Sequence, residues 1–307
     1  MTVGPDDVRR AAERIEGRVR RTPVINVVVN GRPVVLKLEL LQHTGSFKPR
    51  GAFNRVLGAE SIPRAGIIAA SGGNHGLATA YVAGELGIHA EVFVPEVSPR
   101  VKVKAIEALG ATVEVAGALY HDALVASQRR AAETGALQIH AYNHQLTVAG
   151  QGTMAAEISE QVPDAAEVVI AVGGGGLISG AVAWFSDRLG VTAVEPSGSP
   201  ALQRAMSAGR PVDVEIDSIA SDSLGARSIG DIPWSVLREH LPTSILVSDE
   251  AIIAAQKWLW TKLKLVVEPG GATAFAAVLD GTHTPSETGR TVVVVCGANT
   301  DPSLVVG

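Results

Sequence analysis

Short apolar segments alternate with amphipathic segments along most of this chain, and this alternation limits its fold more than any other feature. Runs rich in Val, Ala and Ile, such as 67–70 and 168–172, are typical of strands, and the segments between them, such as 120–133, show helical periodicity. Strands that alternate with helices pair in parallel, and strands without polar alternation lie in sheets covered on both faces. We therefore expect an α/β architecture with parallel sheets.

The same pattern gives the expected elements, without marking where one domain ends. The expected strands are 34–39, 67–70, 91–94, 112–115, 137–140, 167–172, 191–195 and 291–296. The expected helices are 6–19, a stretch after Gly51, 74–86, 101–109, 120–133, 148–161, 178–189, 250–263 and 271–279. No segment has the composition of a linker, so any division into domains must come from elsewhere.

Composition and charge argue against several classes of function. The chain has 307 residues and a net charge of −5, and it has no basic stripe of the kind that binds nucleic acid. Its single cysteine cannot form an intrachain disulfide. The uncharged run 168–186 has the length of a membrane span, but the four glycines inside it favour a strand, a turn and a helix. The N-terminus lacks the apolar core of a secretory signal. We expect a cytoplasmic enzyme that binds neither nucleic acid nor membrane.

Lys48 is a candidate nucleophile. It lies between Phe47 and Pro49, after an expected strand and a Gly45-Ser46 turn. Burial among apolar groups lowers the pKa of an amine and frees its lone pair to attack a carbonyl carbon. The alternative is a solvated surface lysine, which most lysines are.

Two loops at the ends of expected strands are candidate anion sites. Residues 71–76 (Ser-Gly-Gly-Asn-His-Gly) open a helix, whose N-terminus would suit a carboxylate, although an ordinary capped turn has the same composition. Gly173 to Gly176 follow a Val-rich strand. Four adjacent glycines exceed the needs of a turn and favour close approach of a phosphate. The dinucleotide fingerprint fails, since Ile178 or Ser179 stands where its third glycine belongs, and no P-loop lysine follows.

Taken together, these segments resemble the fold-type II pyridoxal-phosphate enzymes, most closely the threonine/serine dehydratases and the serine racemase-like enzymes among them. The motifs that carry the resemblance are 37–39, 42–52, 71–75, 149–153, 172–177, 194–196, 268–272 and 296–299. They stand in the family's order and cover nearly the whole chain. The implied fold is α/β and tryptophan synthase β-like, with two three-layer domains whose sheets are mostly parallel.

The resemblance also implies how the chain is divided and assembled. Residues 1–56 and 145–307 would form a large domain that binds pyridoxal 5′-phosphate, and residues 57–144 a small domain that carries the Asn74 loop. The active site would lie between the two domains. The implied assembly is a homodimer.

Single residues receive roles from the same resemblance. Lys48 would hold the cofactor as a Schiff base and then move the Cα proton of the substrate. The further cofactor contacts that it implies are Phe47, Asn74, Gly173, Gly174, Gly175, Gly176, Leu177, Glu268 and Cys296. The substrate would meet the loop residues Ser71, Gly72, Asn74 and His75.

Cys296 has two interpretations. A lone cysteine at the end of a Val-rich strand is usually a small core residue. In the family the corresponding position faces the ring nitrogen of the cofactor. A neutral thiol there, unlike a carboxylate, would not keep that nitrogen protonated, and we expect this to favour a short reaction such as β-elimination.

The implied reaction removes water and ammonia from L-threonine and/or L-serine, or from a related β-hydroxy amino acid such as hydroxyaspartate or phenylserine, and gives a 2-oxo acid. A β-replacement enzyme of the cysteine synthase type is the alternative on the same scaffold, and a racemase is another. Residues 44–48 and 173–176 favour the dehydratase. A non-catalytic cofactor-binding protein and a nucleotide-binding protein are the alternatives outside this chemistry. The intact Lys48 and the failed fingerprint argue against them.

The chain departs from the family at four places. Gly72 stands where racemising relatives carry a serine acid, and no second carboxylate near Glu195 completes a divalent-cation site, so we expect no efficient racemisation and no bound metal. The chain stops at Gly307, so we do not expect the regulatory domain of biosynthetic threonine dehydratases. Residues 222–227 are unusual and could shape specificity, with Arg227 either a substrate contact or a surface arginine.

Overall fold

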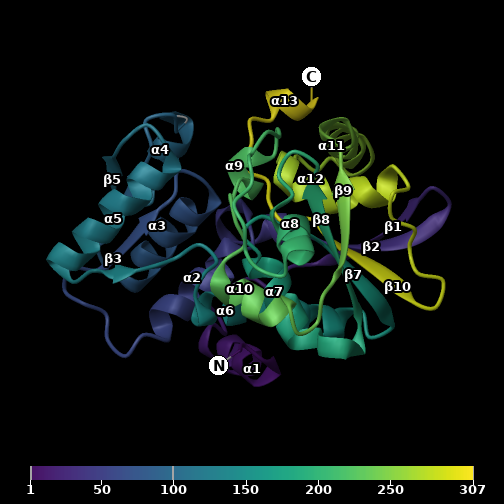
Figure 1. Ribbon diagram of the computed structural model, residues 1–307, viewed down its shortest axis with the longest axis horizontal. Helices are drawn as coiled ribbons and strands as arrows, with labels where there is room; N and C mark the ends of the chain where they lie inside the picture. Colours follow the sequence, from purple (N-terminus) through teal and green to yellow (C-terminus); the bar gives the residue numbers. More distant parts are fainter. Residues whose placement is uncertain (1, 99, 307) are drawn as a thin grey trace.

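The apolar runs form the strands of two separate β-sheets, seen at the left and right of Figure 1. The structure is a computed structural model that describes residues 2–98 and 100–306. Nearly all successive residues of β3 (Ile67–Ala70) and β8 (Gly190–Pro196) are buried, so both faces of each sheet are covered. The expected α/β fold with mostly parallel sheets is confirmed.

The smaller sheet carries a parallel strand order that places one loop at its centre. Its order is β5-β4-β3-β6, and all neighbours are parallel. The other strands are β4 (Ala90–Val94), β5 (Thr112–Val115) and β6 (Leu137–Gln138). Because β3 is paired on both sides, the loop that follows it opens in the middle of the carboxyl edge of the sheet.

The larger sheet has the order β1-β2-β10-β7-β8-β9 and is parallel except for the β1–β2 hairpin at its edge. Its further strands are β1 (Val24–Val29), β2 (Arg32–Lys37), β7 (Ala165–Ala171), β9 (Thr243–Val247) and β10 (Arg290–Val294). The loops after β7 and β10 therefore leave the same edge, side by side.

Helices connect and cover these strands. The α-helices are α1 (Pro5–Arg14), α2 (Lys48–Leu57), α3 (Asn74–Leu86), α4 (Arg100–Ala108), α5 (Tyr120–Thr134), α6 (Gln145–Gln161), α7 (Gly176–Phe185), α8 (Ala201–Ala208), α9 (Ser221–Leu224), α10 (Asp231–Leu237), α11 (Asp249–Leu263), α12 (Pro269–Leu279) and α13 (Ser303–Val306). Three short 3-10 helices are η1 (Glu39–Leu41), η2 (His43–Gly45) and η3 (Ser186–Arg188) within the described ranges.

The expected elements miss two edge strands and misplace several ends. β1 turns into β2 through Asn30 and Gly31, both at positive φ (51° and 78°), which is the type I′ hairpin that an Asn-Gly pair signals. β9 is half-exposed and lacks a strong apolar pattern. The first helix ends at Arg14 instead of residue 19, and the expected strand 137–140 is paired only over Leu137–Gln138.

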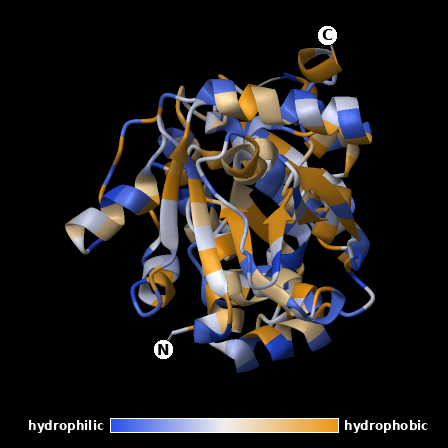
Figure 2. Ribbon diagram, turned by 90° about the vertical axis from the view of Figure 1, so that its right-hand side faces the viewer, coloured by the Kyte–Doolittle hydropathy of each residue, from blue (hydrophilic) through white to orange (hydrophobic). Residues whose placement is uncertain are grey.

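The core of the larger sheet is built from the Val-rich strands, which Figure 2 shows as hydrophobic ribbons inside a more hydrophilic outer layer. The uncharged run 168–186 belongs to this core. It forms the end of β7, the glycine loop and α7, as a strand, a turn and a helix. Across the ranges that the structure covers, no helix is long and apolar enough to cross a membrane.

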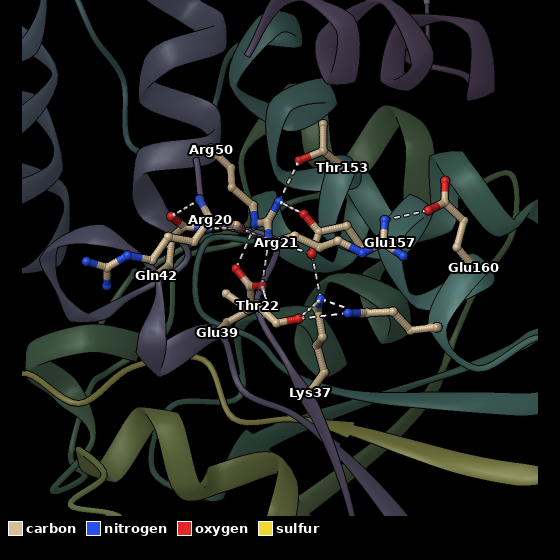
Figure 3. A network of polar contacts seen from close by, with 12 residues as sticks. Arg20, Arg21, Thr22, Lys37, Glu39, Gln42, Arg50, Thr153, Glu157 and Glu160 are labelled. Carbon is tan, nitrogen blue, oxygen red and sulfur yellow. Dashed lines mark hydrogen bonds and ion pairs between the residues drawn. The ribbon is translucent and has the colours of Figure 1, made fainter. Parts of the chain in front are cut away.

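A network of buried charges joins the β2 end of the larger sheet to two helices (Figure 3). The Arg50 guanidinium, on α2, lies 2.7 Å from Glu39 Oε2 and 2.7 Å from Glu157 Oε1, which belongs to α6. The side chains of Arg50 and Glu39 are both 0% exposed. Burial would raise the pKa of Glu39, but Arg50, Lys37 and the Thr22 hydroxyl together keep this pKa below its usual value.

Lys37, at the end of β2, enters the same network. Its ammonium donates to Glu157 Oε2 at 2.6 Å, to Gln161 Oε1 at 2.7 Å and to the Thr22 carbonyl at 2.9 Å. Each charge in the network has an opposite charge and further hydrogen bonds, as a buried ion needs. The network therefore fixes α2 against β2 and α6.

Removing one carboxylate from this network should destabilise the fold strongly. We expect Glu39→Gln to lower the free energy of unfolding by about 3 kcal/mol, because the buried Arg50 charge loses one of its two carboxylate partners. Glu160→Gln is the matched control, since Glu160 pairs with Arg21 at the surface with side chains 65% and 54% exposed, and it should cost less than about 1 kcal/mol. Urea unfolding measures both, and equal losses would contradict a central role for the network.

Candidate active site

Two adjoining pockets lie where loops from the carboxyl edges of both sheets meet. The first is lined by Phe47, Lys48, Asn74, Gly173 to Leu177, Glu268 and Cys296 among others. The second shares Lys48 and Asn74 with the first and adds Ser71, Gly72 and His75. Every residue that the sequence predicts for cofactor or substrate therefore lines one of these pockets. Lys48 stands at their junction.

Lys48 is the first residue of α2, and Pro49 fits the first helical turn because that turn needs no N–H donor there. Its ammonium donates to the Ala141 carbonyl at 3.3 Å and lies 5.0 Å from the centre of the Phe47 ring. Burial lowers the pKa of Lys48 to about 8, against the opposing effect of Cys296 and Glu268. The fraction of molecules in which the Lys48 amine is neutral near pH 7 is thus larger than the corresponding fraction for a surface lysine.

The glycine loop between β7 and α7 lines the first pocket, and its glycines let Leu224 and Pro233 pack against it. Gly175 has a φ of +89°, a conformation that favours glycine, and a Cβ there would lie 2.9 Å from Pro233. A Cβ on Gly173 would lie 3.1 Å from the Leu224 backbone. The N–H groups of the first turn of α7 have no partner within the helix and lie at its positive end. This cradle fits a phosphate group.

The Asn74 loop presents a second helix N-terminus to the second pocket. Ser71 to Gly73 lead from β3 into α3, and Ser71 Oγ accepts from the Gly73 N–H at 3.2 Å. The Nε2 of the buried His75 ring donates to the Ile139 carbonyl at 2.8 Å, so this nitrogen is already paired. Burial and then the nearby Lys48 lower the pKa of His75 to about 3. The loop can therefore offer backbone N–H groups to an anion, and His75 adds no charge.

Cys296, Glu268 and Asn74 form the remaining wall of the first pocket. Asn74 Nδ2 donates to Glu268 Oε1 at 2.6 Å. Burial raises the pKa of Glu268 to about 7, although the Asn74 hydrogen bond opposes this. Burial also raises the pKa of the Cys296 thiol, whose Sγ lies 3.5 Å from the Gly270 carbonyl. The thiol is therefore a neutral group.

Sequence reasoning missed several residues that line the pockets. Tyr142 packs over the glycine loop, since a Cβ on Gly174 would lie 2.5 Å from its ring, and Tyr120 lines the second pocket. Ser223, which also lines it, belongs to the segment 222–227 that the sequence analysis singled out. The rule that ligands bind beyond the carboxyl ends of parallel strands could have indicated Tyr142, which follows β6. Arg227 is exposed, and the pocket lining ends at Ala226, so Arg227 is a surface arginine here.

Glu195, at the end of β8, caps a helix. Its two carboxylate oxygens accept from the backbone N–H groups of Leu202 at 2.7 Å and Gln203 at 2.9 Å, at the start of α8. Burial raises the pKa of Glu195 to about 7, and these two bonds oppose the rise. Among the described residues no group of three His, Cys, Asp or Glu side chains could hold a metal ion. That the protein needs no metal stays a prediction.

An alanine in the glycine loop should weaken cofactor binding. We expect Gly175→Ala to raise the dissociation constant of pyridoxal 5′-phosphate at least about tenfold, because the left-handed φ and Pro233 both oppose a Cβ. Gly281→Ala is the matched control, with a φ of +84° and no atom within 4 Å. Fluorescence titration in a Lys48→Ala background, where binding is reversible, gives both constants. Equal affinities in the two variants would contradict the cradle.

Covalent capture of the cofactor should report the lowered pKa of Lys48. Since only the neutral amine attacks the aldehyde, we expect the capture rate to rise with pH through about 8 and then level off. Stopped-flow absorbance of the cofactor-free protein mixed with pyridoxal phosphate measures this rate. Nα-acetyl-lysine under the same conditions corrects for the cofactor's own ionisation and should keep rising toward about pH 10.4. A protein profile that rises in the same way would mean that burial leaves the amine unperturbed.

Comparisons with known proteins agree with this geometry. The family model "Pyridoxal-phosphate dependent enzyme" matches residues 15–297. The L-threonine ammonia-lyase of Thermotoga maritima is 32% identical over 98% of this chain and 76% of its own length, and the phenylserine dehydratase of Ralstonia pickettii is 35% identical over 94% and 90%. The structure of maize serine racemase superimposes with a TM-score of 0.91 at 34% identity, covering 98% of this chain and 95% of that one. The chain belongs to the family of pyridoxal-phosphate dependent enzymes.

Proposed function

We propose that the protein is an ammonia-lyase that converts L-threonine or L-serine, or a related β-hydroxy amino acid, into a 2-oxo acid and ammonia. The observation that carries the proposal is the position of Lys48, whose buried amine stands between a cradle for a phosphate and a loop suited to a carboxylate. Relatives named L-threonine ammonia-lyase and phenylserine dehydratase support this reading.

The residues present fit pyridoxal 5′-phosphate. The glycine loop and the start of α7 would hold its phosphate, Asn74 would donate to its ring hydroxyl, and Cys296 would face its ring nitrogen. When bound, the cofactor supplies an electron sink for the pair left at Cα. The protein's part is to hold the substrate and to move protons.

Two elements of the chain act on the substrate. The N–H groups at the start of α3 bind its carboxylate and so orient the Cα–H bond toward Lys48. Neutral Lys48 Nζ takes the Cα proton. The Cβ hydroxyl leaves as water with a proton from the protonated Lys48 amine, which returns to its neutral form. The released enamine tautomerises to an imine, which takes up one water and gives the 2-oxo acid and ammonia.

The second pocket has room for β substituents of different sizes. It has a volume of about 320 Å³, and its lining includes apolar residues such as Pro95 and Val97 beside polar residues such as Ser98 and Asp222. Because Val97 is 72% exposed, this wall does not by itself select the methyl group of L-threonine over the hydrogen of L-serine.

Gly72 supports elimination over racemisation. Racemisation needs an acid that returns a proton to Cα on the face opposite Lys48, and Gly72 has no such group. The space beside Gly72 is taken by Ser98, because a Cβ on Gly72 would collide with Ser98 Oγ. A β-replacement reaction would use the same proton transfer at Cα, and it is separated from elimination by assay.

Assembly and location belong to the same proposal. We propose that the protein acts on small amino acids as a homodimer in the cytoplasm, as the family resemblance implies. Its one thiol, Cys296, is buried and so has no role in linking subunits by a disulfide.

A panel of substrates tests the proposed reaction. We expect equimolar 2-oxo acid and ammonia from L-threonine or L-serine, and the ratio of the two kcat/KM values ranks these substrates. Lys48→Ala should abolish release, and Lys262→Ala, at an exposed lysine, should leave it unchanged. Phenylserine, hydroxyaspartate, and O-acetylserine with sulfide complete the panel. Normal cofactor binding without ammonia from any hydroxy acid would contradict the proposal. A product that forms only when sulfide is present would indicate a β-replacement enzyme instead.

A further inference from the structure

Asn299 holds the amide of Asn74 from the side opposite Glu268. Asn299 Nδ2 donates to Asn74 Oδ1 at 2.6 Å and to the Thr44 carbonyl at 2.8 Å. The other end of the Asn74 amide donates to Glu268 Oε1 at 2.6 Å. Asn74 and Glu268 are 8% and 3% exposed, so water cannot readily replace these bonds.

The Thr44 carbonyl gives this chain of hydrogen bonds its direction. A backbone carbonyl only accepts, so the Asn299 atom that faces it must be the NH₂ group. The same NH₂ group meets Asn74, which must then present its carbonyl oxygen to Asn299. The NH₂ group of Asn74 is left to face Glu268 and the pocket. The Thr44 carbonyl, through Asn299, and the Glu268 carboxyl group on the other side thus favour the same orientation of the Asn74 amide.

Local packing is built around Asn299. Gly45 has a φ of +72°, and a Cβ on it would lie 2.8 Å from Asn299 Oδ1, so no side chain at position 45 fits beside Asn299. The Ala298 N–H donates to the Gly45 carbonyl at 2.9 Å, and the Phe47 N–H donates to the Cys296 carbonyl at 3.2 Å. The segment 296–299 is therefore paired with the turn that leads into Lys48. Asn299 lies where this turn, the end of β10 and the Asn74 loop meet.

We propose that Asn299 is a positioning residue that turns the Asn74 amide so that its NH₂ group, and not its oxygen, faces the ring oxygen of the cofactor. The inference rests on the proposed function in one respect, since it takes Asn74 as the contact of the ring hydroxyl. If the Asn74 amide were reversed, its oxygen would face the Glu268 carboxylate oxygen, and two acceptors would meet without a donor. The role of Asn299 is thus to keep a donor at this position while substrates and products exchange.

The test uses two ligands that differ only in the ring hydroxyl. Binding of pyridoxal 5′-phosphate and of its 3-deoxy analogue is measured by fluorescence titration in a Lys48→Ala background, where neither ligand is held covalently. Asn299→Asp keeps the size of the side chain but removes its donor, so Asn74 is no longer held with its NH₂ group toward the ring. We expect a loss of about tenfold or more in affinity for pyridoxal phosphate and a change within about twofold for the 3-deoxy analogue.

Asn143→Asp is the matched control. The Asn143 side chain accepts from the Ile232 N–H at 2.9 Å through its oxygen, which aspartate retains, and Asn143 lies outside the lining of both pockets. It should leave the affinities for both ligands within about twofold. Asn299→Ala, which removes the donor without adding charge, should show the same selective loss and serves if the aspartate variant does not fold.

Each outcome bears on the inference. Equal losses for both ligands would reduce Asn299 to a structural residue, and no loss for either would show that Asn74 keeps its orientation unaided. Lack of any preference for the hydroxyl in the parent protein would overturn the contact between Asn74 and the ring. These binding measurements do not depend on turnover. Selective loss without ammonia release from any amino acid would uphold the positioning role while the lyase proposal fails.

Discussion

The buried pairing of Arg50 with Glu39 and Glu157 is the interaction on which the placement of the site depends. Arg50 stands two residues after Lys48 on α2, so the bonds that hold its guanidinium also hold the first turn of that helix. These bonds engage the carboxylates of both Glu39 and Glu157, and the Lys37 ammonium also pairs with Glu157 Oε2. Lys48 itself has no carboxylate partner in an ion pair among the described residues, and burial lowers the pKa of its amine to about 8 against the opposing effect of Cys296 and Glu268.

The site binds anions with backbone groups in place of cationic side chains. Lys48 is the only Lys or Arg among the described residues that line the two pockets. The helix N-termini of α3 and α7 provide the positive ends instead, and His75 is neutral. A second fixed cation would compete for the substrate and would lower the pKa of Lys48 further. Backbone dipoles attract anions without that effect and are already oriented when a ligand arrives.

How far the sequence predicts this structure depends on whether the interactions are local. The central strands carry continuous apolar runs, and Lys48, Asn74 and Gly173 to Gly176 stand in compact motifs, so all of these could be predicted. The edge strand β9 is half-exposed, and its apolar run is only the three residues Ile-Leu-Val. The network and the Asn74 contacts could not be predicted, because Glu157 lies 107 residues from Arg50 and Asn299 lies 225 residues from Asn74. Only the folded chain brings these groups together.

The contact between Gly72 and Ser98 has an evolutionary consequence. A serine at position 72 is what the family resemblance associates with racemisation. In this fold its Cβ would meet the Ser98 hydroxyl, so Ser98 would have to turn to another rotamer to admit it. The effect of a change at position 72 therefore depends on which residue stands at 98. Access to a second activity is in this sense coupled between two loops, through epistasis.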